Sequence, residues 1–402
     1  MMFTKRLLGQ KNQRGVAMLI AIFTMIFIFY LVTEILYETN VEYVVHAQSV
    51  NRLKAYYAAK SGLQLSLLRI KVYQQVSKQL GANAQGPQKK LLDMIWSMPF
   101  AWPPVIPDTV DSVDKSMIKE KVKEAKMDAT YLTTISDEGS KIDVNDLNSP
   151  SKAMQKATRT LLEQIYQNKI QNDDKWAASH RDIKIDEIIN SIADWETDTP
   201  NSLNGGSKPG LYSKFNDPNM PPNRAFRTID EVRMVVGMTD DIWDLFKDRI
   251  TVYGMHAINP NYATREVLMA LDASIKPEVA DAIITRRNDD TQGGFFGSAQ
   301  DFWGFVNSKG AAVSPETQQA IPLVFDAVYN FRIRSVGDYG GATREITAVT
   351  FDLQSMAGKI ASQIQRDAAG GPAPAASTGN SSTTSTDPLP KGPPRIVYYN
   401  EN

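Results

Sequence analysis

Acidic side chains alternate with other residues at 194–198, where Asp194, Glu196 and Asp198 come directly before a long loop rich in glycine, asparagine and proline. Asp217 lies within the same loop. Calcium prefers about six to eight oxygen ligands from carboxylates and carbonyls, so this pattern predicts a structural Ca²⁺ site that fastens the loop. The alternative is a set of helix caps and Asx turns with solvated carboxylates, because EF-hand spacing is absent and Lys208 stands where another acid would help.

Residue patterns typical of catalysis are missing from the rest of the sequence. His46, His180 and His256 are far apart along the chain, and there is no cysteine. Neither a nucleophile elbow nor a phosphate-binding glycine loop occurs. The sequence therefore predicts a structural or interaction protein and not an enzyme. A metallohydrolase is the weaker alternative, and it would require turnover that is lost on chelation.

The composition also restricts the partners. The 402 residues carry 44 basic and 45 acidic side chains, for a net charge of −1, and the mean hydropathy is −0.31. A near-neutral body does not attract a polyanion, so no nucleic acid is expected as a partner. The absence of cysteine excludes a disulfide framework and is compatible with a periplasmic domain stabilised by its core.

A single membrane-spanning helix is predicted at 16–37. The apolar run begins at Val16 and continues without a charge through Thr33, which is long enough to cross most of a bilayer core of roughly 30 Å. The residues before it are basic and the first charges after it are acidic, which places the N-terminus in the cytoplasm. A plain single-pass anchor and a secretory signal peptide are the alternatives, but 33–38 lacks a small-residue cleavage site. The basic residues of the leader are Lys5, Arg6, Lys11 and Arg14.

This leader, which ends at Gly15 directly before the apolar helix, resembles the leaders of type IV pilins and type II secretion pseudopilins. The resemblance implies that prepilin peptidase cleaves between Gly15 and Val16 and that Val16 becomes an N-methylated terminus. Most members carry a glutamate at the fifth mature residue, which pairs with the terminal amine of the subunit ahead, but this chain has Ile20 there. In this respect the chain resembles the minor pseudopilins of the general secretion pathway protein K family, which begin the fibre.

Further segments resemble the protein K family in both order and composition. They are the alanine-and-glycine stretch 56–63, the Lys-Ile-Asp-Val-Asn-Asp-Leu-Asn run 141–148, the Asp-Trp segment at 194–198, the Phe-to-Glu-Val segment 226–232 and the Ile-Asn segment 258–264. The resemblance implies a heterotrimeric tip complex with other minor pseudopilins and contacts with the major pseudopilin, the inner-membrane secretion platform and prepilin peptidase. It also implies calcium in the helical domain, as in some relatives. A minor type IV pilin used for adhesion or DNA uptake is the alternative function.

The predicted fold class is α+β, with a long N-terminal helix packed on a small antiparallel sheet and a large helical domain inserted in that sheet. Alternating strands are predicted at 129–136 and 141–145, as one hairpin, and at 329–336 and 343–351, as another. Two helix-hairpin-helix-like pairs, at 224–254 and 257–288, lack the basic surplus of a DNA-binding site. The predicted units are a leader (1–15), the long helix (16–75), a pilin-like domain (76–149 and 326–360), the helical domain (150–325) and a disordered tail (361–402).

Overall fold

The computed structural model describes residues 14–80, 87–106, 111–215, 217, 219–325, 328–352 and 393–402. The leader up to residue 13 and the greater part of the predicted tail lie outside these residues.

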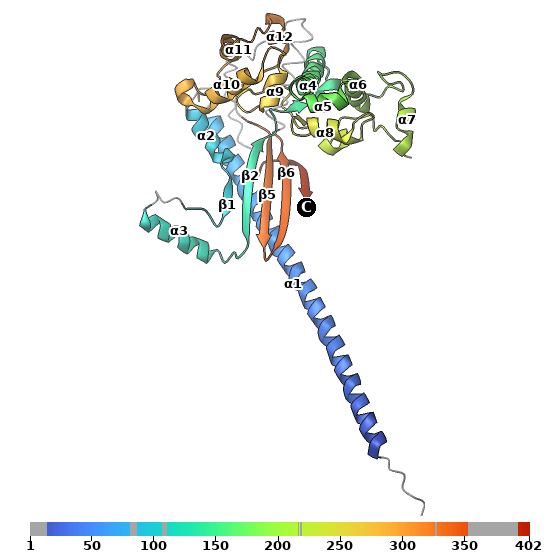
Figure 1. Ribbon diagram of the computed structural model, residues 1–402. Coiled ribbons are helices and arrows are strands. Elements are labelled where there is room, and N and C mark those ends of the chain that lie inside the picture. The colour runs from blue at the N-terminus through green and yellow to red at the C-terminus, as the bar shows by residue number, and fades with distance from the viewer. Residues whose placement is uncertain are drawn as a thin grey trace, which may run out of the picture.

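A single helix, α1 (Arg14–Leu80), runs through 67 residues and is therefore about 100 Å long. No proline interrupts it, and this one continuous helix covers the long helix predicted at 16–75. Figure 1 shows its N-terminal half projecting from the body of the molecule as a bare stem. The most apolar stretch of this half has a mean hydropathy of 2.6 and no buried residue, and α1 is the one helix among the described residues that is long and apolar enough to cross a membrane.

The second half of α1 packs across a five-stranded antiparallel sheet of order β1-β2-β5-β6-β7. The strands are β1 (Phe100–Trp102), β2 (Thr130–Asp137), β5 (Phe331–Tyr339), β6 (Ala342–Thr350) and β7 (Ile396–Glu401). Helix α2 (Pro87–Ser97) packs on α1, and α3 (Ser112–Glu124) follows β1. The predicted strand segments before and after the helical domain therefore do share one sheet, through the pairing of β2 with β5.

Small residues let α1 approach the sheet closely. Ala55, Ala58 and Ala59 are almost completely buried. A Cβ atom added at Gly62 would clash with the side chains of Ser335 and Thr133, and Ser335 donates a hydrogen bond of 2.7 Å to the carbonyl oxygen of Ala59. The alanine-and-glycine stretch thus serves packing against the sheet of the same domain.

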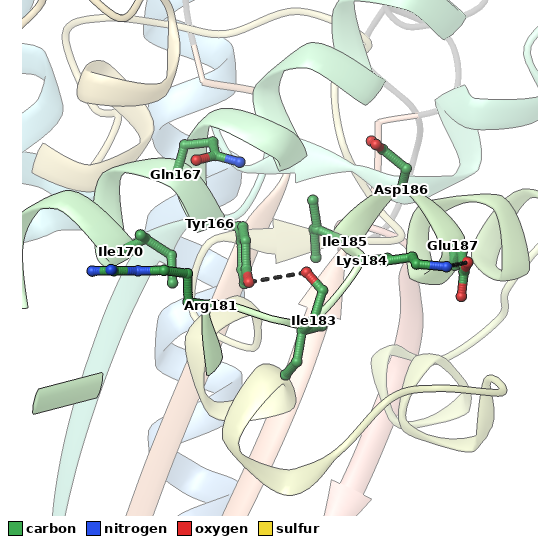
Figure 2. Close-up of a pocket in the computed structure, with 9 residues that line it drawn as sticks. All are labelled: Tyr166, Gln167, Ile170, Arg181, Ile183, Lys184, Ile185, Asp186 and Glu187. Carbon is green, nitrogen blue, oxygen red and sulfur yellow. Dashed lines mark hydrogen bonds and ion pairs between the residues drawn. The ribbon is translucent and has the colours of Figure 1, made fainter. Parts of the chain in front are cut away.

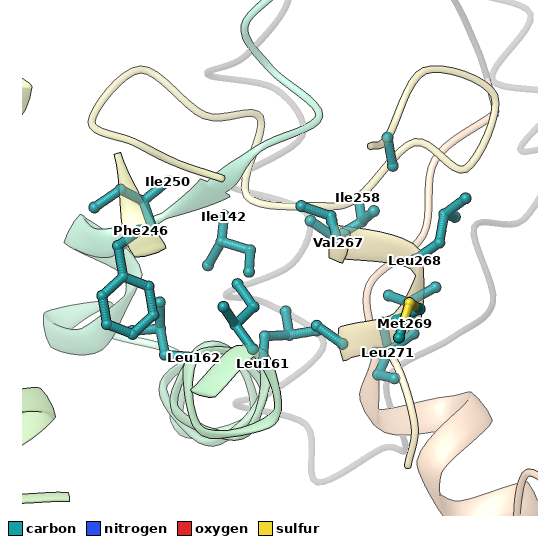
Figure 3. Packing of buried hydrophobic residues seen from close by; sticks show 14 of the residues in the cluster. Ile142, Leu161, Leu162, Phe246, Ile250, Ile258, Val267, Leu268, Met269 and Leu271 are labelled. Carbon is teal, nitrogen blue, oxygen red and sulfur yellow. The ribbon is translucent and has the colours of Figure 1, made fainter. Parts of the chain in front are cut away.

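The helical domain has a hydrophobic core of its own, part of which is shown in Figure 3. Ile142 and Ile250 meet Leu161, Leu162 and Phe246 there. Its helices are α4 (Lys152–Asn172), α5 (Asp174–His180), α6 (Ile185–Glu196), α7 (Lys208–Leu211), α8 (Asp240–Phe246), α9 (Arg265–Ala270), α10 (Pro277–Asn288), α11 (Ala299–Ser308) and α12 (Pro315–Ala320). Its 3₁₀ turns are η2 (Val144–Asn148), η3 (Ser213–Phe215), η4 (Ile229–Met234) and η5 (Asp290–Gln292).

The hairpin predicted from 129–136 and 141–145 is wrong. Strand β3 (Ile142–Asp143) turns away from β2 and pairs in parallel with β4 (Ile250–Thr251) in a separate two-stranded sheet. The reason is burial, because Ile142 is only 1% exposed and belongs to the core of the helical domain. Ile142, Val144 and Leu147, which precede residue 150, consequently contribute to the core of the helical domain.

Two further predictions need correction. The C-terminal end of the predicted disordered tail forms β7, which pairs with β6 because apolar and aromatic residues suited to strands follow the low-complexity segment. The first element of the 224–254 pair is the 3₁₀ turn η4, whose N-cap residue Thr228 makes no side-chain cap bond. The corresponding helix of the second pair, α9, is capped by Thr264, whose hydroxyl accepts a hydrogen bond from the backbone N–H of Val267.

Candidate functional site

The membrane end of α1 is the first candidate site. Gly15 and Val16, the predicted cleavage pair, lie in the first turn of α1, and Val16 is exposed. Ile20 is 59% exposed and has only uncharged residues around it in the sequence from 16 to 33. In a bilayer this surface meets lipid or another helix, and it has no carboxylate with which to bind an amine.

A second part of α1 is also apolar and uncovered. Leu53, Tyr57, Leu68 and Val72 are exposed by 54, 56, 57 and 40% beside the buried face that packs on the sheet. Spacings of four and eleven residues place them within about one third of the helix circumference at ~100° per residue. We call these four residues the α1 stripe. Exposed polar side chains, among them Ser61 and Gln64, share this face of the helix.

The predicted calcium ligands do not converge on one point. Asp194 is buried, and its carboxylate accepts hydrogen bonds from the Ser202 hydroxyl at 2.6 Å and from the backbone N–H of Leu203 at 3.0 Å. Asp198 and Asp217 are exposed. Asp194 therefore serves to hold the start of its own loop.

Glu196, the remaining predicted ligand, points into a different environment. It is buried, its Oε1 atom has no hydrogen-bond partner among the described residues, and burial together with the charges of Asp143 and Asp146 raises its pKa to about 9. Burial and the charge of Asp146 likewise raise the pKa of Asp143 to about 7. In these surroundings Glu196 holds a proton at neutral pH.

His256 completes this group, which we call the buried acid cluster: Asp143, Asp146, Glu196 and His256. His256 forms an ion pair with Asp146 through Nδ1. Asp143 accepts hydrogen bonds from the backbone N–H groups of Asn145 and Gly254, at 3.0 and 2.9 Å. The spacing of these residues along the chain does not indicate the cluster, although the run at 141–148 contains both of its aspartates. Among the described residues, no three histidine or acidic side chains are arranged to hold a metal ion.

Lys208 lies in the middle of the loop that follows Asp198. Its positive charge is unfavourable for a calcium ion nearby. Its side chain is almost completely buried, at 1% exposure. The ammonium donates to the carbonyl oxygens of Asp194 and Thr197 at 2.7 and 2.5 Å. It also contacts Thr197 Oγ1 and Asn223 Oδ1, each at 3.1 Å.

A pocket of about 440 Å³ opens between α4 and the segment leading into α6 (Figure 2). Tyr166 forms one wall and donates a hydrogen bond of 3.1 Å to the carbonyl oxygen of Ile183. Lys184 and Glu187 at its rim are paired with each other at 2.8 Å. The lining mixes apolar side chains such as Ile170 and Ile185 with charged ones such as Arg181 and Asp186.

The apolar half of α1, which fits a single-pass membrane anchor, its packed half and the sheet together define a class of protein, namely a pilin-like protein with a helical domain inserted in its sheet. Residues 258–321, which span α9 to α12, match the family model for the type II secretion system (T2SS), protein K. This match confirms the resemblance to the protein K family. The proteins of that family are structural components of a secretion system and not enzymes.

The fold also matches a solved structure. A chain in the crystal structure of the GspK-GspI-GspJ complex from the enterotoxigenic Escherichia coli type 2 secretion system matches with a TM-score of 0.52 and 16% sequence identity. The match covers 78% of this chain and 95% of that chain. At this identity the likeness concerns the fold. No curated protein matches the sequence.

Proposed function

We propose that this protein is a minor pseudopilin that lies at the tip of the type II secretion pseudopilus, helps to initiate its assembly and supports protein export across the outer membrane. One observation carries the proposal: α1 has a bare apolar half for the membrane and a second half packed on a sheet, yet position 20 lacks the acid of shaft subunits. The match of residues 258–321 to protein K supports the choice of secretion system.

Ile20 argues for the first position in the fibre. A glutamate inside lipid needs a partner, which in a shaft is the terminal amine of the subunit ahead. A subunit with nothing ahead of it gains nothing from that glutamate and would bear the cost of an unpaired carboxyl in hydrocarbon. An apolar side chain at position 20 removes this cost.

The shape of the molecule also supports a place at the tip of the fibre. The helical domain lies at the end of the body that is remote from the membrane half of α1, where it widens the molecule beyond the sheet (Figure 1). At the tip of a fibre this domain meets no further subunit. It would then be free to contact the outer-membrane channel or the exported protein.

The partners follow from the proposed position. Because the solved relative is a complex with GspI and GspJ, we expect other minor pseudopilins to bind this chain as a tip complex. The α1 stripe, a set of four uncovered apolar side chains on one helix face, is suited to contact the helix of such a partner. The body would lie in the periplasm, with α1 in the inner membrane, and prepilin peptidase, the secretion platform and the major pseudopilin would be further contacts.

Co-purification tests the proposal. The full-length chain is co-expressed with candidate companion minor pseudopilins, extracted in detergent and isolated through a tag on this chain. A stoichiometric complex is expected. Leu68→Arg should break it by placing a charge in the α1 stripe, whereas Gln300→Arg, at an exposed polar position of α11 in the helical domain, should leave it intact.

Two results would contradict the proposal. One is the recovery of this chain evenly along isolated fibres instead of at one end. The other is tight binding of the purified protein to duplex DNA at physiological salt, which would favour a type IV pilin used in DNA uptake.

A further inference from the structure

The loop at 197–223 is held by an internal cation. Lys208 Nζ lies within 3.1 Å of four oxygen atoms: two backbone carbonyls, one hydroxyl and one amide carbonyl. These oxygens come from the end of α6 and, through Asn223, from the far end of the loop. One ammonium group therefore joins the beginning, the middle and the end of a long segment.

The position of the ammonium has a simple electrostatic basis. The carbonyls of Asp194 and Thr197 belong to the last turn of α6 and its C-cap, where helix carbonyls carry partial negative charge, and that of Asp194 also accepts the backbone N–H of Thr197 at 3.3 Å. A lysine is a suitable partner for such carbonyls. Burial lowers the pKa of Lys208, while the charges of Asp194 and Asp198 oppose this effect.

The contacts of Lys208 resemble those of a bound metal ion in kind but not in number or charge. Calcium prefers about six to eight oxygens, several of them carboxylate oxygens. The four oxygens around Nζ are all neutral, and the carboxylate of Asp194 is directed to Ser202 and Leu203 instead. The acids expected from the sequence as ligands therefore do not fit calcium in this arrangement.

We infer that the ammonium group of Lys208 takes the place of a divalent ion and makes the loop, and with it this face of the helical domain, independent of calcium. The loop contributes one ring, Tyr212, to a group of three buried aromatic side chains. Trp195 stacks on Phe226 at a centroid distance of 5.4 Å and meets Tyr212 edge-on at 5.9 Å. Fixing the loop keeps these rings covered whatever the calcium concentration in the surroundings.

The first experiment uses the full-length protein in detergent, without any substitution. Its Tm is measured in EDTA and in millimolar CaCl₂, together with hydrogen exchange of peptides from 197–223. The same Tm and the same protection of the loop are expected in both solutions. A calcium-dependent increase in the protection of these peptides overturns the inference, whether or not the protein assembles as proposed.

The second experiment removes the charge. Lys208→Met keeps an unbranched apolar stem but leaves the four oxygens without their donor, so we expect Tm to fall by roughly 5–10 °C and protection of the loop to be lost. The matched control is Lys184→Met, at an exposed lysine of the same domain, which should leave both unchanged. An unchanged Tm and an unchanged loop in Lys208→Met would overturn the inference. If that variant does not fold, the comparison of EDTA and CaCl₂ on the unsubstituted protein decides.

Discussion

His256 and Asp146 form an ion pair that joins the loop after β4 to the 3₁₀ turn after β3. Asp146 is nearly buried and His256 is mostly buried, so the pair is largely shielded from solvent. It belongs to the buried acid cluster, in which Asp143 and Glu196 add further carboxyl groups. Two predictions concern this cluster.

The pH dependence of stability should show the contribution of His256. Burial alone would lower its pKa, but the hydrogen bond and charge of Asp146 prevail and raise the pKa from 6.5 to about 9. The charged pair is therefore complete below pH 6.5, and its contribution is lost as the pH rises through about 9. We expect His256→Asn to lower the free energy of unfolding by about 2–3 kcal/mol at pH 6, with a smaller difference at pH 10.

Asparagine is the replacement because His256 has a φ of 55°, a conformation that asparagine tolerates. Thermal or urea unfolding across the pH range measures the difference, and His46→Asn, at an exposed histidine on α1, is the control. A constant difference between the variant and the unsubstituted protein from pH 6 to pH 10 would show that the ion pair does not contribute.

Glu196 should oppose stability at alkaline pH. Its pKa is raised by burial and by Asp143 and Asp146 from 4.5 to about 9, so the folded protein holds a proton that the unfolded chain releases above pH 4.5. Stability then falls as the pH rises between these two values. Glu196→Gln removes the ionisation, and we expect its Tm at pH 8 to exceed that of the unsubstituted protein by a few degrees, ~2–6 °C.

The matched control for Glu196→Gln is Glu187→Gln on the same helix, where the carboxylate is exposed and paired with Lys184. That substitution should leave Tm nearly unchanged at both pH 5 and pH 8. A Tm of Glu196→Gln that is lower than that of the unsubstituted protein at pH 8 would mean that the ionised carboxylate is stabilised by a partner, such as a bound cation.

The contact between α1 and the sheet should depend on Gly62. A methyl group there would meet Ser335 and Thr133, whereas one at Gly304 in α11 would meet open space. We expect Gly62→Ala to lower the free energy of unfolding by about 1–3 kcal/mol through overpacking. Gly304→Ala should instead raise it by about 0.5–1 kcal/mol, because alanine favours a helix. Equal effects of the two substitutions in urea unfolding would contradict the close approach of helix and sheet.

Cleavage of the leader should depend on Gly15. In cells that contain prepilin peptidase, mass spectrometry of the mature protein should find a methylated N-terminus at Val16. Gly15→Leu should retain the leader, because a bulky side chain hinders access of an enzyme to the backbone. Gly9→Leu, within the leader, is the control and should be processed normally. Detection of residues 1–15 on the unsubstituted mature protein would refute this prediction.

The sequence by itself determined the elements whose cause is local. An uninterrupted apolar and then amphipathic run specifies α1, small residues at 55–62 specify its close packing, and alternating residues specify β2, β5 and β6. The order of short motifs was enough to indicate the protein K family, because each motif is a contiguous run of residues.

Only the tertiary structure decided the contacts between distant segments. It paired β3 with β4 and added β7 to the sheet, because burial of Ile142 and pairing along β6 depend on residues more than forty positions away. It also placed Lys208 among the oxygens of its loop, and it brought Glu196 to Asp143 and Asp146 instead of to Asp194. Whether a carboxyl or an ammonium group binds an ion, forms a pair or loses its charge depends on burial and on neighbours in space, which spacing along the chain does not specify.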